Sequence, residues 1–312
     1  MLRCLFSEAQ SASFDTMPEP PTMPPADRTE AIRKRPTTLG GMNIASLAIS
    51  GALVLAYGLF GRWGEAQPDV FVSYWHQLLQ ASPLCFAFMV VAVVTRGVTI
   101  TGAVAGLVIA VILRARFGSS MLVTLIVVFA LTWAATRFDY YRKMAAGLAE
   151  SRAGRNGLQV LANLAPAAAL AIFYPVDLAV VAILGEVAAD TVASEIGQAF
   201  GGQPRLITSL RPVSVGSNGG VTWLGTVAGV VAATAVVLAA LLGRNFEFGD
   251  NIPVFSWWSF ICLLSAAAGM FVDSFLGATL ERKVLNNNAV NFISASFAAL
   301  IAIVGLIARL RL

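Results

Sequence analysis

The stretch GEVAADTVASEIG, Gly185 to Gly197, decides how this chain must fold. It lies inside an apolar run from about 178 to 200, which at a rise of about 1.5 Å per residue is long enough to cross a bilayer. Three carboxylates, Glu186, Asp190 and Glu195, interrupt that run. An ionisable side chain at membrane depth costs about 2.5–3.5 kcal/mol. Three of them so close together predict a partner that offsets this cost, most simply a divalent cation.

The spacing of the carboxylates sets a geometric condition. At about 100° per residue, Glu186 and Asp190 lie on one stripe of a helix, together with Ser194. Glu195 lies about 140° away from Asp190, so a regular helix cannot direct both side chains at one point. Either the helix is broken near Ala193, or Glu195 makes a different contact.

Composition places the chain in the membrane. Of its 312 residues, 57% are hydrophobic and only 12% are charged, and the mean hydropathy is +0.76. A soluble chain carries about twice that charged fraction. We therefore predict an all-α, polytopic transmembrane helical bundle. Residues 1–41 are polar and Pro-rich and are expected to be a disordered cytoplasmic tail, followed by a single transmembrane domain at 42–312.

The apolar runs predict about nine spans, at 43–60, 82–95, 98–113, 119–136, 158–174, 178–200, 218–242, 254–278 and 289–308. Arg96 splits the run 82–113, whose halves are either two spans or short, re-entrant segments. With the N-terminus in the cytoplasm and the C-terminus outside, most basic segments fall on the cytoplasmic side, as the positive-inside rule requires. Arg114 and Arg116 are the exceptions.

An internal repeat is also indicated. GVTITGAVAGLVIA at 97–110 aligns with GVTWLGTVAGVVAA at 220–233, with nine of fourteen positions identical. We infer two parallel units of three spans, at about 97–174 and 218–308, with the carboxylate helix between them. The alternative is that helices rich in small residues resemble one another, because GxxxG spacing is common where membrane helices pack.

The polar clusters all fall at the predicted cytoplasmic face. The glycine-rich stretch from Gly216 to Gly220 runs into a helix start, and free backbone N–H groups at such a position form an anion site. Carboxylates beside an anion site favour phosphoryl transfer, in which Mg²⁺ is held by one or two carboxylates and the substrate phosphates. The sequence has no P-loop, Rossmann fingerprint or kinase signature, so any nucleotide would bind a site embedded in the membrane.

Five ordered stretches resemble one integral membrane family, which includes transmembrane protein 19 and the plant phytyl-phosphate kinase. They are RNGLQVLAN, ADTVASEIG, PRLIT followed by GSNGG and VTWLG, DSFLGATLE, and NNNAVNF. The resemblance covers roughly Arg96 to the C-terminus. It implies transfer of a phosphoryl group from CTP, or another nucleoside triphosphate, to an isoprenyl or phytyl monophosphate, giving the diphosphate.

Together, the residues and the resemblance define a candidate site. The catalytic candidates are Asp190, Glu195 and Asp273, and the candidate Mg²⁺ ligands are Glu186, Asp190 and Asp273. The candidate nucleotide-phosphate residues are Gly216, Ser217, Asn218, Gly219, Gly220 and Arg211. The candidate acceptor-binding residues are Arg155, Asn156, Gln159, Asn163, Asn288 and Asn291.

The expected partners are an isoprenoid lipid phosphate, a nucleotide and the bilayer, with no nucleic acid. The expected location is a bacterial cytoplasmic membrane. Two other functions stay open at this point. Intramembrane carboxylates and parallel repeats also suit an ion-coupled transporter. A cytidylyltransferase that makes a CDP-lipid would share the metal and CTP chemistry.

Overall fold

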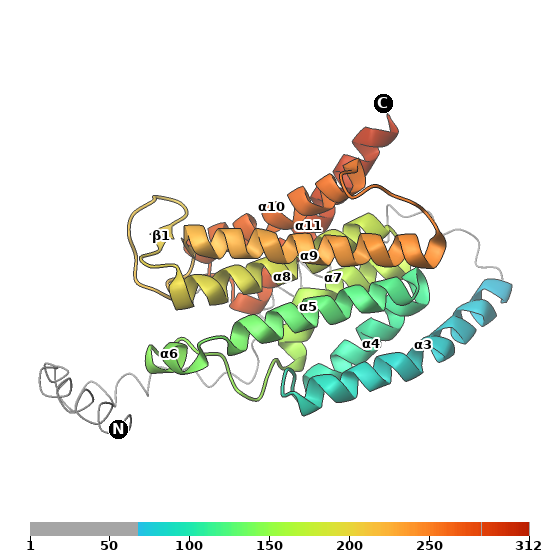
Figure 1. Cartoon of the computed structure of the whole chain (residues 1–312), viewed down its shortest axis with the longest axis horizontal. Helices are drawn as coiled ribbons and strands as arrows, with labels where there is room; N and C mark the ends of the chain where they lie inside the picture. Colours follow the sequence, from blue (N-terminus) through green and yellow to red (C-terminus); the bar gives the residue numbers. More distant parts are fainter. Residues whose placement is uncertain (1–67, 282, 312) are drawn as a thin grey trace, which may run out of the picture. The chain divides into compact units, whose positions relative to one another are not determined.

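The computed structural model of the chain describes residues 68–281 and 283–311, all within one compact unit that begins at Met42. These residues form nine helices and one pair of short strands (Figure 1). The helices are α3 (Pro68–Val94), α4 (Ile100–Phe117), α5 (Ser119–Arg137), α6 (Tyr140–Ala145), α7 (Gly157–Phe173), α8 (Asp177–Phe200), α9 (Trp223–Phe248), α10 (Trp257–Thr279) and α11 (Asn287–Leu310). The strands β1 (Arg205–Leu206) and β2 (Gly220–Val221) pair antiparallel.

Helix α8 is the centre of the bundle. It packs against α5, α7, α9, α10 and α11, and its residues from Leu178 to Ala189 are all buried. A helix that is apolar on every side belongs in the interior, because it has no face to give to solvent or lipid. Its carboxylates are therefore held among other helices and do not face the bilayer.

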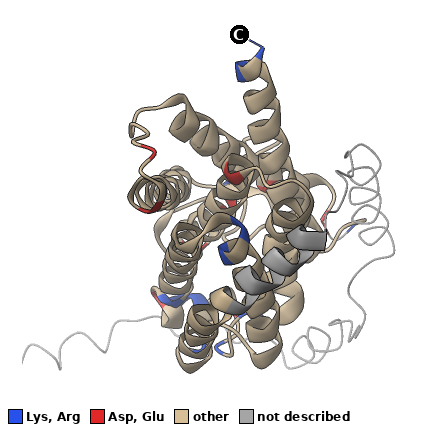
Figure 2. Ribbon diagram, turned by 90° about the vertical axis from the view of Figure 1, so that its right-hand side faces the viewer, with Lys and Arg blue, Asp and Glu red and all other residues tan. Residues whose placement is uncertain are grey.

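The prediction of an all-α membrane bundle is confirmed. Five helices, α4, α5, α9, α10 and α11, are long and apolar enough to cross a membrane. In Figure 2 most of the helical ribbon is tan, so charged residues occupy few positions along it. Eight of the predicted spans correspond to the long helices among the described residues, whereas the span at 43–60 lies outside them. The count of nine spans stays a prediction.

The start of one predicted span differs from the structure, and the split run at 82–113 forms two helices. Helix α9 begins at Trp223 and not near 218, because Gly220 and Val221 pair with β1 and Thr222 is the N-cap. At the split run, Arg96 adopts a left-handed conformation with φ of 54° between α3 and α4. Helix α4 is long enough to span, whereas the apolar part of α3, Ser82–Val94, is shorter.

The two aligned segments of the predicted repeat begin their helices in the same way. Thr99 caps α4 by accepting a hydrogen bond from the N–H of Gly102 at 3.2 Å. Thr222 caps α9 by accepting one from the N–H of Gly225 at 3.1 Å. These threonines and glycines occupy equivalent places in the alignment. The shared cap agrees with a duplication, which itself stays a prediction.

Candidate functional site

The predicted polar clusters meet at one end of the bundle, around a cavity of about 270 Å³ that we call the polar cavity. The ends of α7, α8, α10 and α11 and the loop between α8 and α9 enclose it. Twelve of the predicted site residues line it: Arg155, Gln159, Asn163, Asp190, Glu195, Gly216, Ser217, Asn218, Gly219, Gly220, Asp273 and Asn291. Segments that are far apart in the sequence therefore contribute to one site.

Two carboxylates face each other in the polar cavity. Asp190 comes from α8 and Asp273 from α10, and their side chains interact directly. Both are partly buried. Ser294 of α11 donates a hydrogen bond to Oδ2 of Asp273 at 3.1 Å, which fixes the orientation of that carboxylate. Two like charges this close favour a shared cation.

Glu186 lies one turn deeper in α8. It is 1% exposed, is not among the residues that line the polar cavity, and has an Oε2 atom without a hydrogen-bond partner. It interacts with Asp190 and Asp273 from below. Of the two predicted metal-ligand carboxylates on α8, Asp190 therefore lines the cavity and Glu186 does not.

Glu195 makes a contact separate from that of Asp190, which is the second of the two alternatives that its position on the helix left open. Helix α8 is continuous through Ala193, so the helix is not broken there. The carboxylate of Glu195 forms a buried ion pair with Lys143 of α6. Glu195 lines the polar cavity, but the partner that fixes its charge is Lys143 and not the Asp190–Asp273 pair.

Arg155, which lies just before α7, and Asn163, which lies within it, connect this part of the chain to the other helices of the site. The Nη2 atom of Arg155 donates to Oγ1 of Thr191 on α8 at 3.0 Å. Asn291 of α11 donates through Nδ2 to Oδ1 of Asn163 at 3.2 Å. Asn163 in turn donates to the carbonyl of Gln159 at 2.9 Å. The amide groups thus hold α7 and α11 together at the mouth of the cavity.

The glycine-rich loop closes one side of the polar cavity. Gly219 has a φ of 71°, and a Cβ there would lie 2.6 Å from the carbonyl oxygen of Ser274. Only glycine permits this close approach to α10. The N–H groups of Ser217 and Gly220 donate to the carbonyls of Ser214 and Ser217. These two N–H groups are therefore occupied, in contrast to the fully free loop that the sequence predicted.

Besides Glu186, three predicted site residues, Arg211, Asn156 and Asn288, are not among those that line the polar cavity. Arg211 is exposed, and its carbonyl accepts the N–H of Leu206. Asn156 is the N-cap of α7 and forms a capping box with Gln159. Asn156 thus has a clear structural role in starting the helix.

The side chains present in the polar cavity determine whether it could hold the predicted Mg²⁺ ion. Among the described residues, no three His, Cys, Asp or Glu side chains are grouped so as to hold a metal ion. Mg²⁺ is usually held by one or two carboxylates together with water and substrate phosphates. Asp190 and Asp273 fit this pattern when a triphosphate supplies the remaining oxygens.

Sequence reasoning did not identify Lys143, Thr191 and Ser294 as parts of the site. Each one positions a predicted residue: Lys143 holds Glu195, Thr191 holds Arg155, and Ser294 holds Asp273. Thr191 directly follows Asp190 within the quoted stretch, so its proximity to the site was readable. Lys143 and Ser294 carried no signal that separated them from ordinary helix residues.

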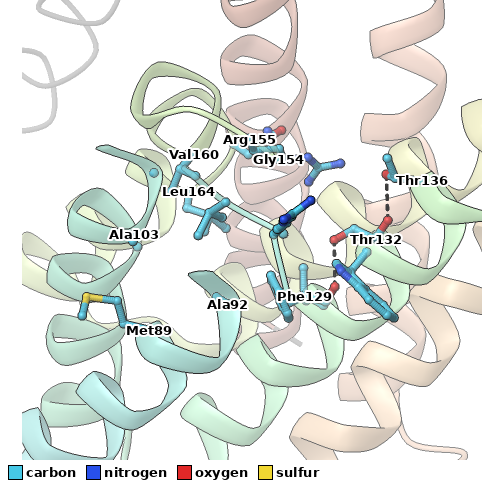
Figure 3. A pocket seen from close by; sticks show the side chains of 18 of the residues that line it. Met89, Ala92, Ala103, Phe129, Thr132, Thr136, Gly154, Arg155, Val160 and Leu164 are labelled. Carbon is cyan, nitrogen blue, oxygen red and sulfur yellow. Dashed lines mark hydrogen bonds between the residues drawn. The ribbon is translucent and has the colours of Figure 1, made fainter. Parts of the chain in front are cut away.

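A second cavity of about 390 Å³, the apolar cavity, lies beside the polar one. Side chains from α3, α4, α5 and α7 line it, and Figure 3 shows Met89, Ala103, Phe129 and Val160 around this space. Arg155 and Asn163 line both cavities. Glu150 lines both as well, so a polar compartment and an apolar compartment adjoin at these three residues.

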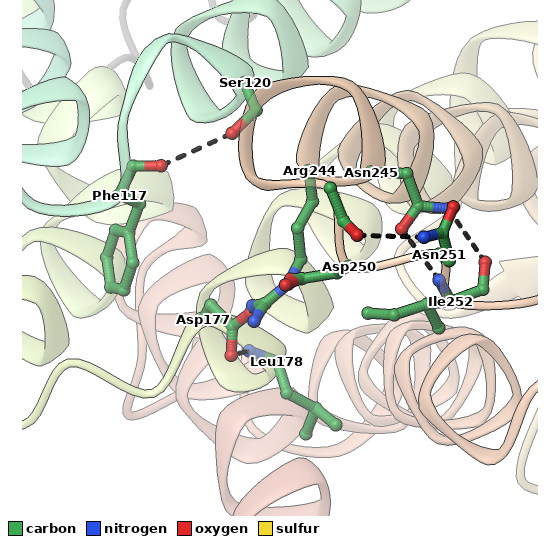
Figure 4. Close-up of polar contacts among 10 residues, drawn as sticks. Phe117, Ser120, Asp177, Leu178, Arg244, Asn245, Asp250, Asn251 and Ile252 are labelled. Carbon is green, nitrogen blue, oxygen red and sulfur yellow. Dashed lines mark hydrogen bonds and ion pairs between the residues drawn. The ribbon is translucent and has the colours of Figure 1, made fainter.

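Several polar groups at the opposite end of the bundle pair with one another. Arg244 pairs with both Asp177 and Asp250 (Figure 4). Asn245 forms two hydrogen bonds with the backbone of Ile252, at 2.8 and 2.9 Å. Glu247 accepts the N–H groups at the start of α5. These contacts close that end of the bundle.

The fold and the two cavities define a multi-pass integral membrane protein with a polar site at one end of its helical bundle. The chain belongs to the integral membrane protein family DUF92, whose family model matches residues 83–299. This result confirms the family recognised from the five ordered stretches.

Three relatives show how widely the family is distributed. The chain is 36% identical to the uncharacterized membrane protein sll0875 of Synechocystis over 63% of this chain and 78% of that protein. It is 26% identical to the chloroplastic protein VTE6 of Arabidopsis thaliana over 84% and 82%. It is 35% identical to protein PGR of the same plant over 34% and 46%. No solved structure matches the chain.

Proposed function

We propose that this protein is a membrane-embedded kinase that transfers a phosphoryl group from a nucleoside triphosphate, CTP by the resemblance, to an isoprenyl monophosphate. One observation carries the proposal: Asp190, Asp273 and Arg155 meet in a polar cavity that adjoins an apolar one. An acceptor with a phosphate head and an apolar chain needs such a pair of compartments. The resemblance to the plant phytyl-phosphate kinase and the match to VTE6 along most of both chains support the same reaction.

The chemistry requires little beyond positioning and charge neutralisation. An oxygen of the acceptor monophosphate attacks the γ-phosphorus of the nucleotide, the bond to the β-phosphate oxygen breaks, and the nucleoside diphosphate leaves. The acceptor is already an anion near neutral pH, so no general base is needed. Asp190 and Asp273 would hold Mg²⁺, which neutralises charge on the phosphates when bound. The Gly216–Gly220 loop and Asn218 would contact the nucleotide phosphates.

The distribution of polar groups supports an enzyme over a transporter. A carrier exposes its central site to each side of the membrane in turn. Here the cavity lies at one end, the residues of α8 from Leu178 to Leu184 below it are apolar and buried, and Arg244 is paired with two carboxylates at the far end. A soluble nucleotide needs access from one side only.

The decisive experiment compares two labels on CTP. Purified protein in detergent is incubated with Mg²⁺, geranylgeranyl monophosphate and CTP labelled at either the γ- or the α-phosphate, and the lipids are separated by thin-layer chromatography. A kinase transfers the γ-label to the lipid and leaves the α-label in CDP. A cytidylyltransferase transfers the α-label.

Two variants serve as controls. Asp190→Asn should abolish the labelled lipid, whereas Asp250→Asn, at the opposite end of the bundle, should retain it. Folded protein that labels no lipid with CTP, ATP or GTP would exclude the kinase and leave an ion-coupled transporter as the best reading.

A further inference from the structure

The inner part of the apolar cavity is bounded mainly by hydrocarbon, whereas its rim is polar. It lies among α3, α4, α5 and α7, with Val187 of α8 at its base. The main apolar side chains that line it are Phe88, Met89, Leu107, Leu125, Val128 and Leu164. The inner part of such a void, lined by these side chains, can accept an apolar chain.

The rim of the apolar cavity is cationic. Arg96, Arg137, Arg152 and Arg155 all line it, and none of the four forms an ion pair with a carboxylate within residues 68–281 and 283–311. Arg137 donates to the carbonyls of Thr95 and Arg96 at 2.7 and 3.0 Å, which leaves other guanidinium N–H groups for a ligand. Glu150 is the carboxylate on this rim. The excess of positive charge suits a phosphate.

The cavity extends well into the bundle from this rim. Leu125 and Arg137 both line it and both belong to α5, so their spacing along the helix corresponds to a depth of about 18 Å at 1.5 Å per residue. On α3, Cys85 is 0% exposed and lines the same cavity. The inner part is therefore enclosed and limits what can enter.

The position of Arg155 indicates how a lipid phosphate would be oriented in the apolar cavity. Arg155, Asn163 and Glu150 line both cavities (Figure 3 shows Arg155 beside the apolar one). A phosphate at Arg155 with its chain in the apolar cavity therefore faces the Asp190–Asp273 pair across the shared wall. Such an arrangement presents the phosphate to the polar cavity and keeps the chain out of it.

We infer that the apolar cavity is a chamber for one prenyl chain, with its phosphate at Arg155 and its terminus beside Cys85. The inference rests on the proposed function and extends it to acceptor selection. A volume of about 390 Å³ lies near the lower end of the range for ligand pockets, about 300–1,000 Å³. It fits a single chain and not the two chains of a bilayer phospholipid. Cys85 then sets the longest chain that the enzyme accepts.

Photo-crosslinking tests the location of the chain in the unaltered protein. The probe is geranylgeranyl monophosphate with a diazirine on its terminal isoprene unit, added to the full chain in detergent. We expect adducts on the segments 85–89 and 125–128, removed by excess geranylgeranyl monophosphate and retained in the presence of phosphatidic acid. Adducts on other segments, an absence of adducts after irradiation, or equal competition by phosphatidic acid would overturn the inference.

A larger side chain at position 85, tested with prenyl ligands of two lengths, examines the role of Cys85. Cys85→Trp fills the inner end of the chamber and should lower the affinity for geranylgeranyl monophosphate by at least about tenfold, while geranyl monophosphate binds as before. Leu84→Trp is the matched control, since Leu84 is 54% exposed and is not among the residues that line the cavity. Equal affinity of both variants for the longer ligand would show that Cys85 does not limit chain length.

Binding and catalysis are read out separately in these experiments. If the chain binds as inferred but no lipid receives the γ-label, the proposed reaction is wrong and the chamber stands. If the γ-label is transferred but the adducts lie outside 85–89 and 125–128, the chamber is wrong and the reaction stands.

Discussion

Lys143 and Glu195 form an ion pair in which the side chains are only 1% and 6% exposed. Nζ of Lys143 also donates to the carbonyls of Ala135 and Thr136, at 3.1 and 3.0 Å. All three donors of the ammonium group are therefore used. The pair joins the end of α5 and the short helix α6 to α8 at the edge of the polar cavity. The pair therefore fixes the positions of these three helices relative to one another next to the site.

Breaking this pair should destabilise the protein strongly. Lys143→Met leaves the carboxylate of Glu195 buried without its cation, and an uncompensated buried charge costs about 3–5 kcal/mol. Thermal unfolding in detergent measures the loss. The control is Arg142→Gln, whose side chain is 67% exposed and forms only a surface pair with Asp139, so its effect should stay below about 1 kcal/mol.

The double variant Lys143→Met with Glu195→Met should be more stable than Lys143→Met alone. A lower stability of the double variant would show that the pair does not act as a unit.

Asp190→Asn and Asp273→Asn should each lower phosphoryl transfer by on the order of 100-fold or more, because each removes a charge that positions the metal and the phosphates. Neither should lower the unfolding temperature, since each replaces one of two adjacent like charges with a neutral group of the same shape. Rate and unfolding are measured on the same preparations. An equal fall in both quantities would assign these residues a structural role.

Gly219 and Gly202 form a natural pair for testing the loop. Their φ values are 71° and 70°, but a Cβ on Gly219 would meet α10, whereas a Cβ on Gly202 would meet open space. Gly202→Ala should therefore cost only about 1–2 kcal/mol, from its left-handed conformation. Gly219→Ala should cost more and should also raise the KM for the nucleotide, because the loop must move away from Ser274. Equal effects of the two substitutions would show that contact with α10 is not limiting.

Part of the site could be predicted because alternating helix directions fix which helix ends share a face. Asp190 and Asp273 were expected on one face, and the polar cavity contains both. The deeper place of Glu186 was not expected. Helical spacing aligns Glu186 with Asp190, but it does not say that only Asp190 lines the cavity. How deeply a residue of α8 is buried depends on the neighbouring helices α10 and α11. The spacing of residues within α8 cannot describe those neighbours.

The contacts of Lys143 and the apolar cavity could not be predicted from the sequence. Lys143 lies on a six-residue helix that follows Asp139 in a left-handed conformation, and no periodicity marks so short an element. The cavity is the space that four packed helices leave unfilled, and each of its lining residues reads in isolation as ordinary core. Sequence patterns identify the faces of helices but not the gaps between them.

Arg155 should control the acceptor more than the nucleotide. Arg155→Gln removes a charged donor at the junction of the two cavities, and a hydrogen bond to a charged group is worth about 1.5–3 kcal/mol. The KM for the prenyl monophosphate should therefore rise roughly 10- to 150-fold, whereas the KM for CTP changes little. Arg155→Lys should recover part of the loss, because it keeps the charge but not the planar fork that reaches Thr191. Arg116→Gln, an exposed arginine at the opposite end of α4, is the control and should leave both constants unchanged. If Arg155→Gln instead raised the KM for CTP alone, the phosphate at Arg155 would belong to the nucleotide, and the acceptor would have to approach the Asp190–Asp273 pair from another side.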